Sequence, residues 1–189
     1  MKNIVLFASG NGTNAENICQ YFLTKTDVKV VALFCNNPQA KVIDKMQKLN
    51  IPVHVITKSE LNNEALFLQQ IKNYSPSLIV LAGFLLLMPN YLVKNFPDKI
   101  INIHPALLPK FGGKGMYGHH VHEAILQQRE KEHGITIHYV NENFDEGEII
   151  FQKKFHVEED DDINAVSNKI AQLEMKYFPE VIENLLNKM

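Results

Sequence analysis

The chain has 189 residues, of which 19 are basic and 21 acidic, giving a formal net charge of −2 at neutral pH. This length is enough for one substantial hydrophobic core, and nothing in the composition demands a second domain. The balanced charge produces no global field that would favour nucleic acid or an anionic membrane, so we expect neither as a partner.

Three features of the sequence predict a cytoplasmic location. The two cysteines, Cys19 and Cys35, fall inside expected regular elements, which suits a reduced compartment better than a disulfide framework. The longest apolar run, from Leu78 to Met88, is too short to span a bilayer. Only a short apolar run precedes Ser9, so no secretory signal is expected.

Apolar runs and amphipathic stretches alternate along the first half of the chain, as buried strands and surface helices do. The expected strands are Asn3–Ala8, Val28–Cys35, Val53–Ile56, Leu78–Ala82 and Ile100–Ile103, and the expected helices are Asn14–Leu23, Ala40–Leu49, Glu64–Tyr74 and Tyr91–Phe96. This rhythm predicts an α/β fold with a mostly parallel central sheet and helices on both faces.

The second half of the chain has a different pattern. Ile135–Val140 alternates, and Ile149–Phe155 follows the turn-like Asp145-Glu146-Gly147, so these two segments predict an antiparallel pair. A helix from about Ile163 to Leu186 is expected to close the chain. The glycine-rich segment Gly112–Gly118 is expected to form a mobile lid or a hairpin.

A glycine-rich loop joins the first expected strand to the first helix. Ser9-Gly10-Asn11-Gly12-Thr13-Asn14-Ala15 fits the pattern G-x-G-x-x-G/A, in which backbone N–H groups approach an anion at a helix N-terminus. The second strand ends in Cys35-Asn36-Asn37, without the acidic residue that would bind the ribose of NAD. The pattern therefore favours a single phosphate on a small substrate, with a simple tight turn as the alternative.

A second loop, Leu81-Ala82-Gly83-Phe84-Leu85-Leu86-Leu87-Met88, leaves the fourth expected strand. Bulky apolar residues that follow a parallel strand normally enter the core. The alternative is an apolar wall for a flat heteroaromatic ring, whose edges backbone groups would read.

The fifth expected strand carries the clearest chemical signal. Asn102 and His104 alternate at its end, so both side chains point to one side, and Pro105 stops the strand. Open α/β sheets bind their ligands at the edge formed by the carboxyl ends of the strands, where this strand ends. Asp145 lies in a later turn, where an aspartate is usually solvated or bonded to its own backbone. It gains a chemical role only if it reaches His104.

No metal site is expected. His122-Glu123 begins like a zinc motif, but position 126 is a leucine where the second histidine would stand. The run Glu158–Asp162 lacks the alternating ligands and the glycine of a calcium loop, and its acidic residues are explained by capping of the following helix.

Taken in chain order, these motifs resemble those of the folate-dependent phosphoribosylglycinamide formyltransferases. Asn102-Ile103-His104-Pro105 with Leu107-Leu108-Pro109 is specific to the wider formyltransferase superfamily, and the loop from Ser9 to Asn14 narrows it to this branch. The resemblance runs nearly end to end, over Ile4–Asn14, Pro76–Phe84, Ile101–Lys110, Glu132–Val140, Phe144–Gly147 and Glu174–Ile182.

The resemblance implies a single-domain, Rossmann-like formyltransferase fold. It divides the domain into a phosphate-binding half at about 1–101 and a catalytic and folate-cleft half at about 102–189. The implied reaction transfers the formyl group of 10-formyltetrahydrofolate, a co-substrate, to the amine of glycinamide ribonucleotide in de novo purine synthesis, without a metal. A monomer or a weak homodimer is expected.

The residue roles that the resemblance implies fall into three groups. The catalytic residues are Asn102, His104 and Asp145. The substrate phosphate is held by Gly12, Thr13 and Asn14, with Glu174 near the ribose. The folate cleft is formed by Leu85, Leu86, Leu87, Met88, Asn141, Glu142, Asn143 and Phe144, together with Asn102 and Asp145.

Acyl-transfer chemistry gives the catalytic trio a physical meaning. Asn102 can donate a hydrogen bond to the formyl oxygen as negative charge develops there. His104 as imidazolium can stabilise the same oxygen and assist proton movement. An unperturbed histidine is mostly neutral at pH 7, so we expect Asp145 to favour the charged form and to orient the ring.

Three features differ from the family pattern. Relatives often have an arginine that assists the phosphate where this chain has Asn63, so a lysine elsewhere is expected to substitute. Many relatives have Met-Arg where this chain has Leu85-Leu86, which removes a charge near the folate. The loop Phe111–His120 is longer than in shorter-looped relatives.

Two other functions remain open at this point. A formyltetrahydrofolate deformylase shares the Asn-His-Asp machinery but normally carries an additional N-terminal regulatory domain. A non-catalytic nucleotide-binding module would need the glycine loop but not Asn102, His104 and Asp145 together.

Overall fold

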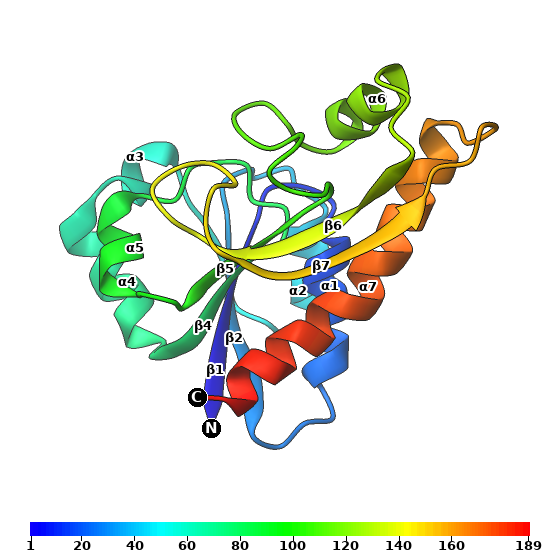
Figure 1. Ribbon diagram of the computed structural model, residues 1–189. Coiled ribbons are helices and arrows are strands. Elements are labelled where there is room, and N and C mark those ends of the chain that lie inside the picture. The colour runs from blue at the N-terminus through cyan, green and yellow to red at the C-terminus, as the bar shows by residue number, and fades with distance from the viewer.

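The computed structural model describes all residues from 1 to 189, and a seven-stranded sheet of order β3-β2-β1-β4-β5-β6-β7 forms its centre (Figure 1). The parallel strands are β1 (Lys2–Ala8), β2 (Val28–Cys35), β3 (Val53–Val55), β4 (Pro76–Leu81) and β5 (Ile100–His104). β6 (Glu132–Tyr139) pairs antiparallel with β5 on one side and with β7 (Ile149–His156) on the other. The predicted mostly parallel sheet with an antiparallel C-terminal pair is confirmed.

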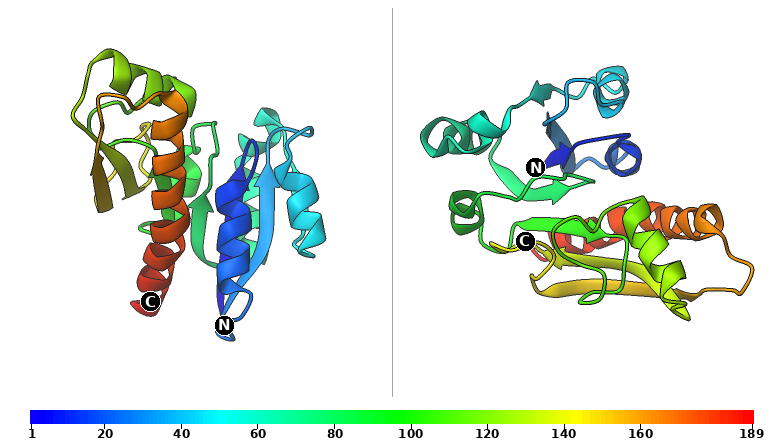
Figure 2. Two further views of the ribbon diagram at one scale, coloured as in Figure 1. Left: turned by 90° about the vertical axis from the view of Figure 1, so that its right-hand side faces the viewer. Right: turned by 90° about the horizontal axis from the view of Figure 1, so that it is seen from above.

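Helices cover both faces of this sheet (Figure 2). One face carries α1 (Thr13–Phe22), α2 (Val42–Lys48) and α7 (Ile163–Asn187), and the other carries α3 (Lys58–Leu61), α4 (Glu64–Asn73) and α5 (Asn90–Asn95). β1 shows why the strands read as unbroken apolar runs. Ile4 and Leu6 belong to the first core, while Val5 and Phe7 belong to the second, as alternation along a strand requires.

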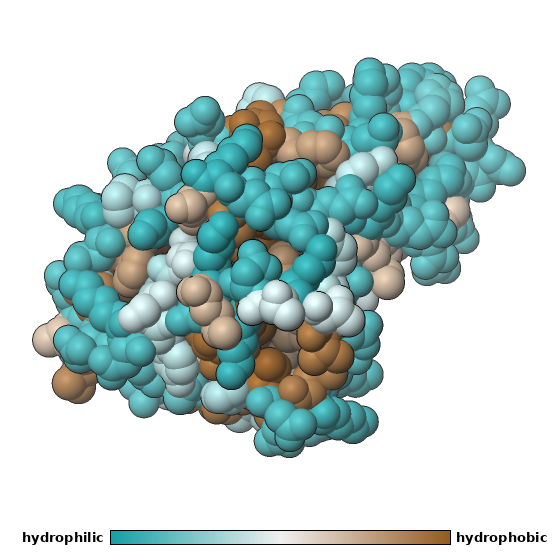
Figure 3. Space-filling view, turned by 90° about the horizontal axis from the view of Figure 1, so that it is seen from below, coloured by the Kyte–Doolittle hydropathy of each residue, from teal (hydrophilic) through white to brown (hydrophobic).

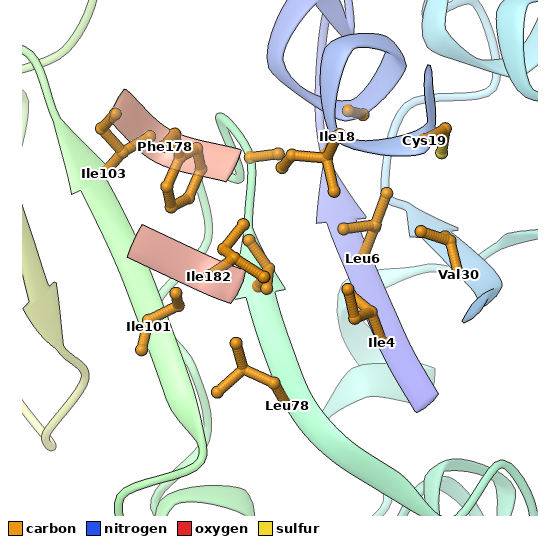
Figure 4. Close-up of a cluster of buried hydrophobic side chains, with 14 of the residues drawn as sticks. Ile4, Leu6, Ile18, Cys19, Val30, Leu78, Ile101, Ile103, Phe178 and Ile182 are labelled. Carbon is orange, nitrogen blue, oxygen red and sulfur yellow. The ribbon is translucent and has the colours of Figure 1, made fainter. Parts of the chain in front are cut away.

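The longest helix, α7, packs on the first core, where its side chains contact strands from both the early and the middle parts of the chain. Figure 4 shows Phe178 and Ile182 of α7 over Ile101 and Ile103 of β5, with Ile4 and Leu78 on the neighbouring strands in the same cluster. Asp162 begins this helix by accepting a hydrogen bond from the N–H of Ala165 at 2.7 Å, so the last residue of the acidic run caps the helix as predicted.

Two helices were not among the predicted elements. The short α3 follows Thr57, whose side chain and that of Glu60 form a capping box. α6 (His119–Gln127) begins inside the segment expected to be a loop, because Val121 and Ile125 bury an apolar stripe in a small third core. The preceding residues Phe111–Gly118 contain turns and no strand, so the alternative of a hairpin is wrong.

The amino ends of the parallel strands lie at the bottom of the molecule, beside both chain termini (Figure 1). The Lys2 ammonium donates to the Leu186 carbonyl at 2.6 Å and so joins the two ends of the chain. Seen from below, this surface is mostly hydrophilic, with hydrophobic residues in small groups (Figure 3). None of the helices combines the length and the apolar character needed to cross a bilayer.

Candidate active site

Three loops emerge side by side at the opposite, carboxyl edge of the sheet. They follow β1, β4 and β5, which are neighbours in the sheet. The first two loops are in direct contact, because the Ser9 N–H donates to the Gly83 carbonyl at 3.0 Å. The third begins at His104, the last residue of β5. The glycine loop, the apolar loop and His104 therefore meet at one edge of the sheet.

Asp145 reaches the end of β5 from the turn between β6 and β7. Its Oδ2 lies 3.5 Å from His104 Nδ1 and accepts the Gly113 N–H at 3.0 Å. Its Oδ1 accepts a long hydrogen bond of 3.4 Å from Asn102 Nδ2. The three predicted catalytic side chains therefore form one cluster, with Asp145 at its centre.

The turn that carries Asp145 fits closely against the sheet. Asp145 itself has a positive φ of 58°. At Gly147, an added Cβ would lie 1.7 Å from the Tyr139 carbonyl oxygen, so no larger side chain fits there. This close approach fixes where the Asp145 carboxylate lies relative to β5.

His138 is a fourth member of the cluster, and it was not predicted. It pairs with Asn102 across β5 and β6, and its Nε2 lies 3.2 Å from Asn102 Nδ2 and 3.6 Å from Asp145 Oδ1. Its Nδ1 donates to the Tyr139 carbonyl at 2.8 Å, which leaves Nε2 as an acceptor in the neutral ring. The sequence held one signal that could have predicted His138: polar residues, Thr136 and His138, stand at alternate positions of an otherwise apolar strand.

Burial decides the charge of His104, which is only 3% exposed. Its Nε2 donates to the Phe111 carbonyl at 2.7 Å, so this nitrogen carries the hydrogen of the neutral ring. Burial lowers the pKa of His104, and this outweighs the upward effects of Asp145 and of the Phe111 carbonyl. The expectation that Asp145 keeps His104 charged near neutral pH is therefore wrong for the ligand-free protein.

The Asp145 carboxylate remains ionised at neutral pH. Burial by itself would raise its pKa, but its contacts with His138, with His104 and with the Gly113 N–H together lower it. The site thus holds a fixed negative charge beside a neutral imidazole. A proton that arrives at His104 Nδ1 would find this carboxylate 3.5 Å away.

The glycine loop ends at the exposed start of α1. Gly12 is the N-cap with a φ of 71°, and no side chain caps the N–H groups of the first turn. Val42 packs against Gly12 so closely that an added Cβ would lie 2.2 Å from its Cγ2. These N–H groups can bind an anion, because a helix N-terminus leaves its first donors without intrahelical partners.

Glu174 of α7 lies beside this loop, as expected. Its Oε2 accepts a hydrogen bond of 2.9 Å from Asn14 Nδ2. Burial raises the pKa of Glu174 to about 7, against the lowering effect of the Asn14 amide. Asn63, in contrast, caps α4 by accepting the Leu66 N–H at 3.4 Å, so it belongs to a different part of the surface.

The residues expected to form the folate cleft differ in accessibility. Leu85 and Leu87 are 47% and 43% exposed, whereas Met88 is 2% exposed and belongs to the second core. Leu86 and Val140 border that same core, which brings the two expected cleft segments together.

The other cleft segment is a polar turn. Asn141 accepts the Asn143 N–H at 3.0 Å, and the Asn143 side chain donates to Glu146 at 2.8 Å. The Glu142 and Asn143 side chains face solvent, while Phe144 is half-buried. No group of three or more His, Cys, Asp or Glu side chains is placed to hold a metal ion.

Comparison with known proteins gives a consistent result along nearly the whole chain. The formyl transferase family model matches residues 2–182. The phosphoribosylglycinamide formyltransferase of Bacillus subtilis (strain 168) is 37% identical, and the match covers 98% of this chain and 95% of that protein. The protein of the same name from Escherichia coli (strain K12) is 30% identical, covering 95% of this chain and 85% of that protein.

Solved structures agree with this match. Phosphoribosylglycinamide formyltransferase from Bacillus halodurans has a TM-score of 0.89 at 34% identity, covering 99% of this chain and 96% of that chain. Glycinamide ribonucleotide transformylase 1 from Geobacillus kaustophilus has a TM-score of 0.87 at 32% identity, covering 98% of this chain and 99% of that chain.

Proposed function

The chain belongs to the formyl transferase family, and we propose that it transfers the formyl group of 10-formyltetrahydrofolate to the amine of glycinamide ribonucleotide. The products are formylglycinamide ribonucleotide and tetrahydrofolate, in de novo purine synthesis. The observation that carries this proposal is the cluster of Asn102, His104 and Asp145 at the sheet edge that also holds the glycine loop.

The reaction is an acyl transfer. The amine nitrogen of glycinamide ribonucleotide attacks the formyl carbon, the carbonyl oxygen becomes an oxyanion, and the bond from carbon to the folate nitrogen then breaks. The attacking amine loses one proton and the leaving nitrogen gains one. The protein has to stabilise the oxyanion and to move this proton.

Asn102 supplies the hydrogen bond to the oxyanion. In the ligand-free arrangement its Nδ2 contacts His138 at 3.2 Å and Asp145 at 3.4 Å. The second contact is at the long end of the hydrogen-bond range and is therefore weak. The amide hydrogen that Asn102 shares with Asp145 is therefore the one that turns to the formyl oxygen, while the contact with His138 keeps the amide oriented.

His104 handles the proton. Because burial lowers its pKa, the ring is neutral before the reaction and can accept the proton of the attacking amine. The resulting imidazolium is stabilised by the Asp145 carboxylate, 3.5 Å from Nδ1. The proton then passes, through water, to the leaving nitrogen of the folate.

The substrate phosphate binds to the free N–H groups at the start of α1, namely Gly12, Thr13 and Asn14. Lys41 adds a charge beside them. The following residue, Val42, donates its N–H to the Gly10 carbonyl at 3.1 Å and packs on Gly12. Lys41 itself is exposed and takes part in no ion pair.

The ribose and the folate occupy the two sides of this site. Glu174, joined to Asn14, accepts hydrogen bonds from the ribose hydroxyls. The exposed side chains of Leu85 and Leu87 form the wall for the pterin ring, with half-buried Leu86 beside them. Backbone groups of Met88 and of the turn Asn141–Asp145 complete the cleft, since the Met88 side chain is in the core.

One assay tests the proposed function. Purified protein is incubated with 10-formyltetrahydrofolate, with and without glycinamide ribonucleotide, and the release of tetrahydrofolate is followed. We expect release only when glycinamide ribonucleotide is present, with formation of its formylated product. Equal release without it would identify a deformylase, and no release in either mixture would point to a non-catalytic nucleotide-binding module.

We further propose that the protein works in the cytoplasm as one domain, with the phosphate-binding half at about 1–101 and the catalytic half at about 102–189. Its partners are the two small-molecule substrates, and it is a monomer or a weak homodimer without nucleic acid or membrane partners. The buried, unpaired thiols of Cys19 and Cys35 suit a reduced compartment. Sedimentation equilibrium over a range of concentrations measures the oligomeric state.

A further inference from the structure

Ser9 is a buried polar residue between the two proposed substrate-binding loops. It follows β1 directly as the first residue of the glycine loop, and it is 6% exposed. Its hydroxyl accepts the Leu85 N–H at 2.9 Å and donates to Asn36 Oδ1 at 2.5 Å. One side chain thus links three loops, those that follow β1, β2 and β4.

The Ser9 backbone strengthens the same link. Its N–H donates to the Gly83 carbonyl at 3.0 Å, and its carbonyl accepts a long bond of 3.4 Å from Asn37 Nδ2. The donor and acceptor groups of Ser9 are therefore committed within the protein. A side chain that is both buried and committed in this way does not bind substrate itself, so its role is to hold other groups in place.

The link to Leu85 determines how the apolar wall faces the site. Gly83 turns the chain with a φ of 78°, and Phe84 then enters the second core. Leu85 comes next, and its N–H is fixed by the Ser9 hydroxyl while its side chain stays 47% exposed. Without that anchor, the backbone at Leu85 is free to rotate and the wall loses its fixed orientation.

We propose that Ser9 is a positioning residue that fixes the folate wall relative to the phosphate loop. This inference rests on the proposed function, because it assigns these two loops to the two substrates. Ser9 sets the separation between the two substrate sites, so that the formyl carbon and the attacking amine meet in one geometry. A displacement of the wall would weaken folate binding and misalign the formyl group, while the phosphate contacts of Gly12–Asn14 would remain.

The test is Ser9→Ala, which leaves the Leu85 N–H and the Asn36 amide oxygen without their partner. We expect the KM for 10-formyltetrahydrofolate to rise about tenfold, because a buried donor left unpaired costs roughly the equivalent of one order of magnitude in an equilibrium. The KM for glycinamide ribonucleotide should change by less than about twofold. Equilibrium binding of an unreactive folate analogue, followed by fluorescence, measures the same loss without turnover.

Two further variants keep the result interpretable. Asn37→Ala removes the 3.4 Å bond to the Ser9 carbonyl, together with the local bond that Asn37 Oδ1 accepts from the Gln39 N–H at 3.0 Å, and should leave both KM values unchanged. Asn36→Ala removes the acceptor of the Ser9 hydroxyl but keeps the bond to Leu85, so a small rise confined to the folate KM is expected. The Asn36 variant also tests the inference if Ser9→Ala fails to fold.

Two results would overturn the inference. One is an unchanged folate KM in folded Ser9→Ala, and the other is an equal rise in both KM values, which a general loss of structure would produce. If the wild-type protein binds the folate analogue but transfers no formyl group, the proposed function fails. The analogue affinities of the wild type and of Ser9→Ala still test the role of Ser9 in that case. Transfer by the wild type with unaltered analogue affinity in Ser9→Ala would refute the role of Ser9 alone.

Discussion

At the scale of single residues, the site depends on ionisable groups whose charge is set by the balance between burial and local contacts. Asp145 contacts His104, Asn102 and the Gly113 N–H, so its removal would affect every member of the cluster. Glu174 shows the opposite balance, since one amide from Asn14 does not offset its burial. These two carboxyl groups, one with a lowered and one with a raised pKa, have different consequences for activity.

Asp145→Asn should lower turnover about 100-fold or more, a size typical of lost acid–base assistance. Asp145 is the strongest influence that raises the pKa of His104, so this substitution should also lower that pKa further. His104→Ala should be at least as damaging, and the double variant should lose much less than the sum, because the pair acts as a unit. Single-turnover rates and NMR titration of His104 measure these effects. Additive losses with an unchanged titration would contradict the coupling.

Glu174→Gln should separate stability from substrate binding. In the folded protein the carboxyl pKa is about 7, against an ordinary value of 4.5, so the folded state keeps a proton that the unfolded chain has lost. Stability therefore falls as pH rises through this window. The stability of Glu174→Gln should not fall over this pH range. At pH 8 the variant should therefore be more stable than the wild type, by about 1 kcal/mol or more.

The same variant should bind glycinamide ribonucleotide more weakly. In the wild type, the KM for this substrate should fall as pH rises through about 7, because the ionised Glu174 is the better acceptor for ribose hydroxyls. In Glu174→Gln the KM should be higher and should no longer follow this transition. Urea unfolding at pH 5 and pH 8, with KM profiles over the same range, checks both effects.

At the scale of elements, the start of α1 and the start of α2 together form the proposed phosphate site. Gly12 needs its positive φ of 71° and the absence of a Cβ, because Val42 of α2 packs directly on it. Gly10, two residues earlier, has no atom within 4 Å of the position where a Cβ would lie. The two nearby lysines also form a matched pair. Lys45 is in an ion pair with Glu16 at 2.7 Å, whereas Lys41 is in none.

Gly12→Ala should raise the KM for glycinamide ribonucleotide by about tenfold or more and should destabilise the protein by about 1–3 kcal/mol. The added methyl group pushes against Val42 and strains a left-handed residue, so the N–H groups of the first turn move. Gly10→Ala is the matched control and should change neither quantity appreciably. The folate KM should be little affected in both variants. Equal effects on both substrates in folded Gly12→Ala would argue against this assignment.

Lys41→Gln should raise the KM for glycinamide ribonucleotide several-fold at low salt and should reduce its dependence on salt, since an exposed cation acts through screened charge. Lys45→Gln, which breaks only the pair with Glu16, should leave that KM nearly unchanged. Steady-state kinetics at two ionic strengths compares the variants. A salt dependence retained in full by Lys41→Gln would assign the phosphate to another cation.

At the scale of the whole molecule, α7 makes the two halves of the chain interdependent. Phe178 and Ile182 lie in the same core as Ile4 of β1 and Ile101 of β5 (Figure 4). The helix also brings Glu174 to the glycine loop near the other end of the chain. The core that α7 closes thus positions one side of the proposed substrate site.

Phe178→Ala should destabilise the protein by about 3–5 kcal/mol, because this fully buried ring cannot be replaced by water or by neighbouring side chains. Met175→Ala, on the same helix but 48% exposed, should cost less than about 0.5 kcal/mol. Urea unfolding should remain a single transition in both variants, since the two halves share this core. Two separate transitions would show that the halves fold independently.

The sequence by itself determined the strand pattern and the position of the chemistry along the chain. Unbroken apolar runs indicated strands buried on both faces, and a strand ending in Asn102 and His104 indicated a ligand-binding edge. The glycine loop likewise predicted the start of α1. These features are local, because backbone conformation and side-chain alternation depend on near neighbours in the chain.

Only the tertiary structure decided the partners and the charges. Cross-strand register brought His138 to Asn102, and the turn between β6 and β7 brought Asp145 to His104. Burial left His104 neutral, and packing placed the Met88 side chain in the core instead of on the wall of the proposed folate cleft. Desolvation, and contacts between distant segments, depend on many residues that come together only in the folded chain, so no short stretch of sequence predicts them.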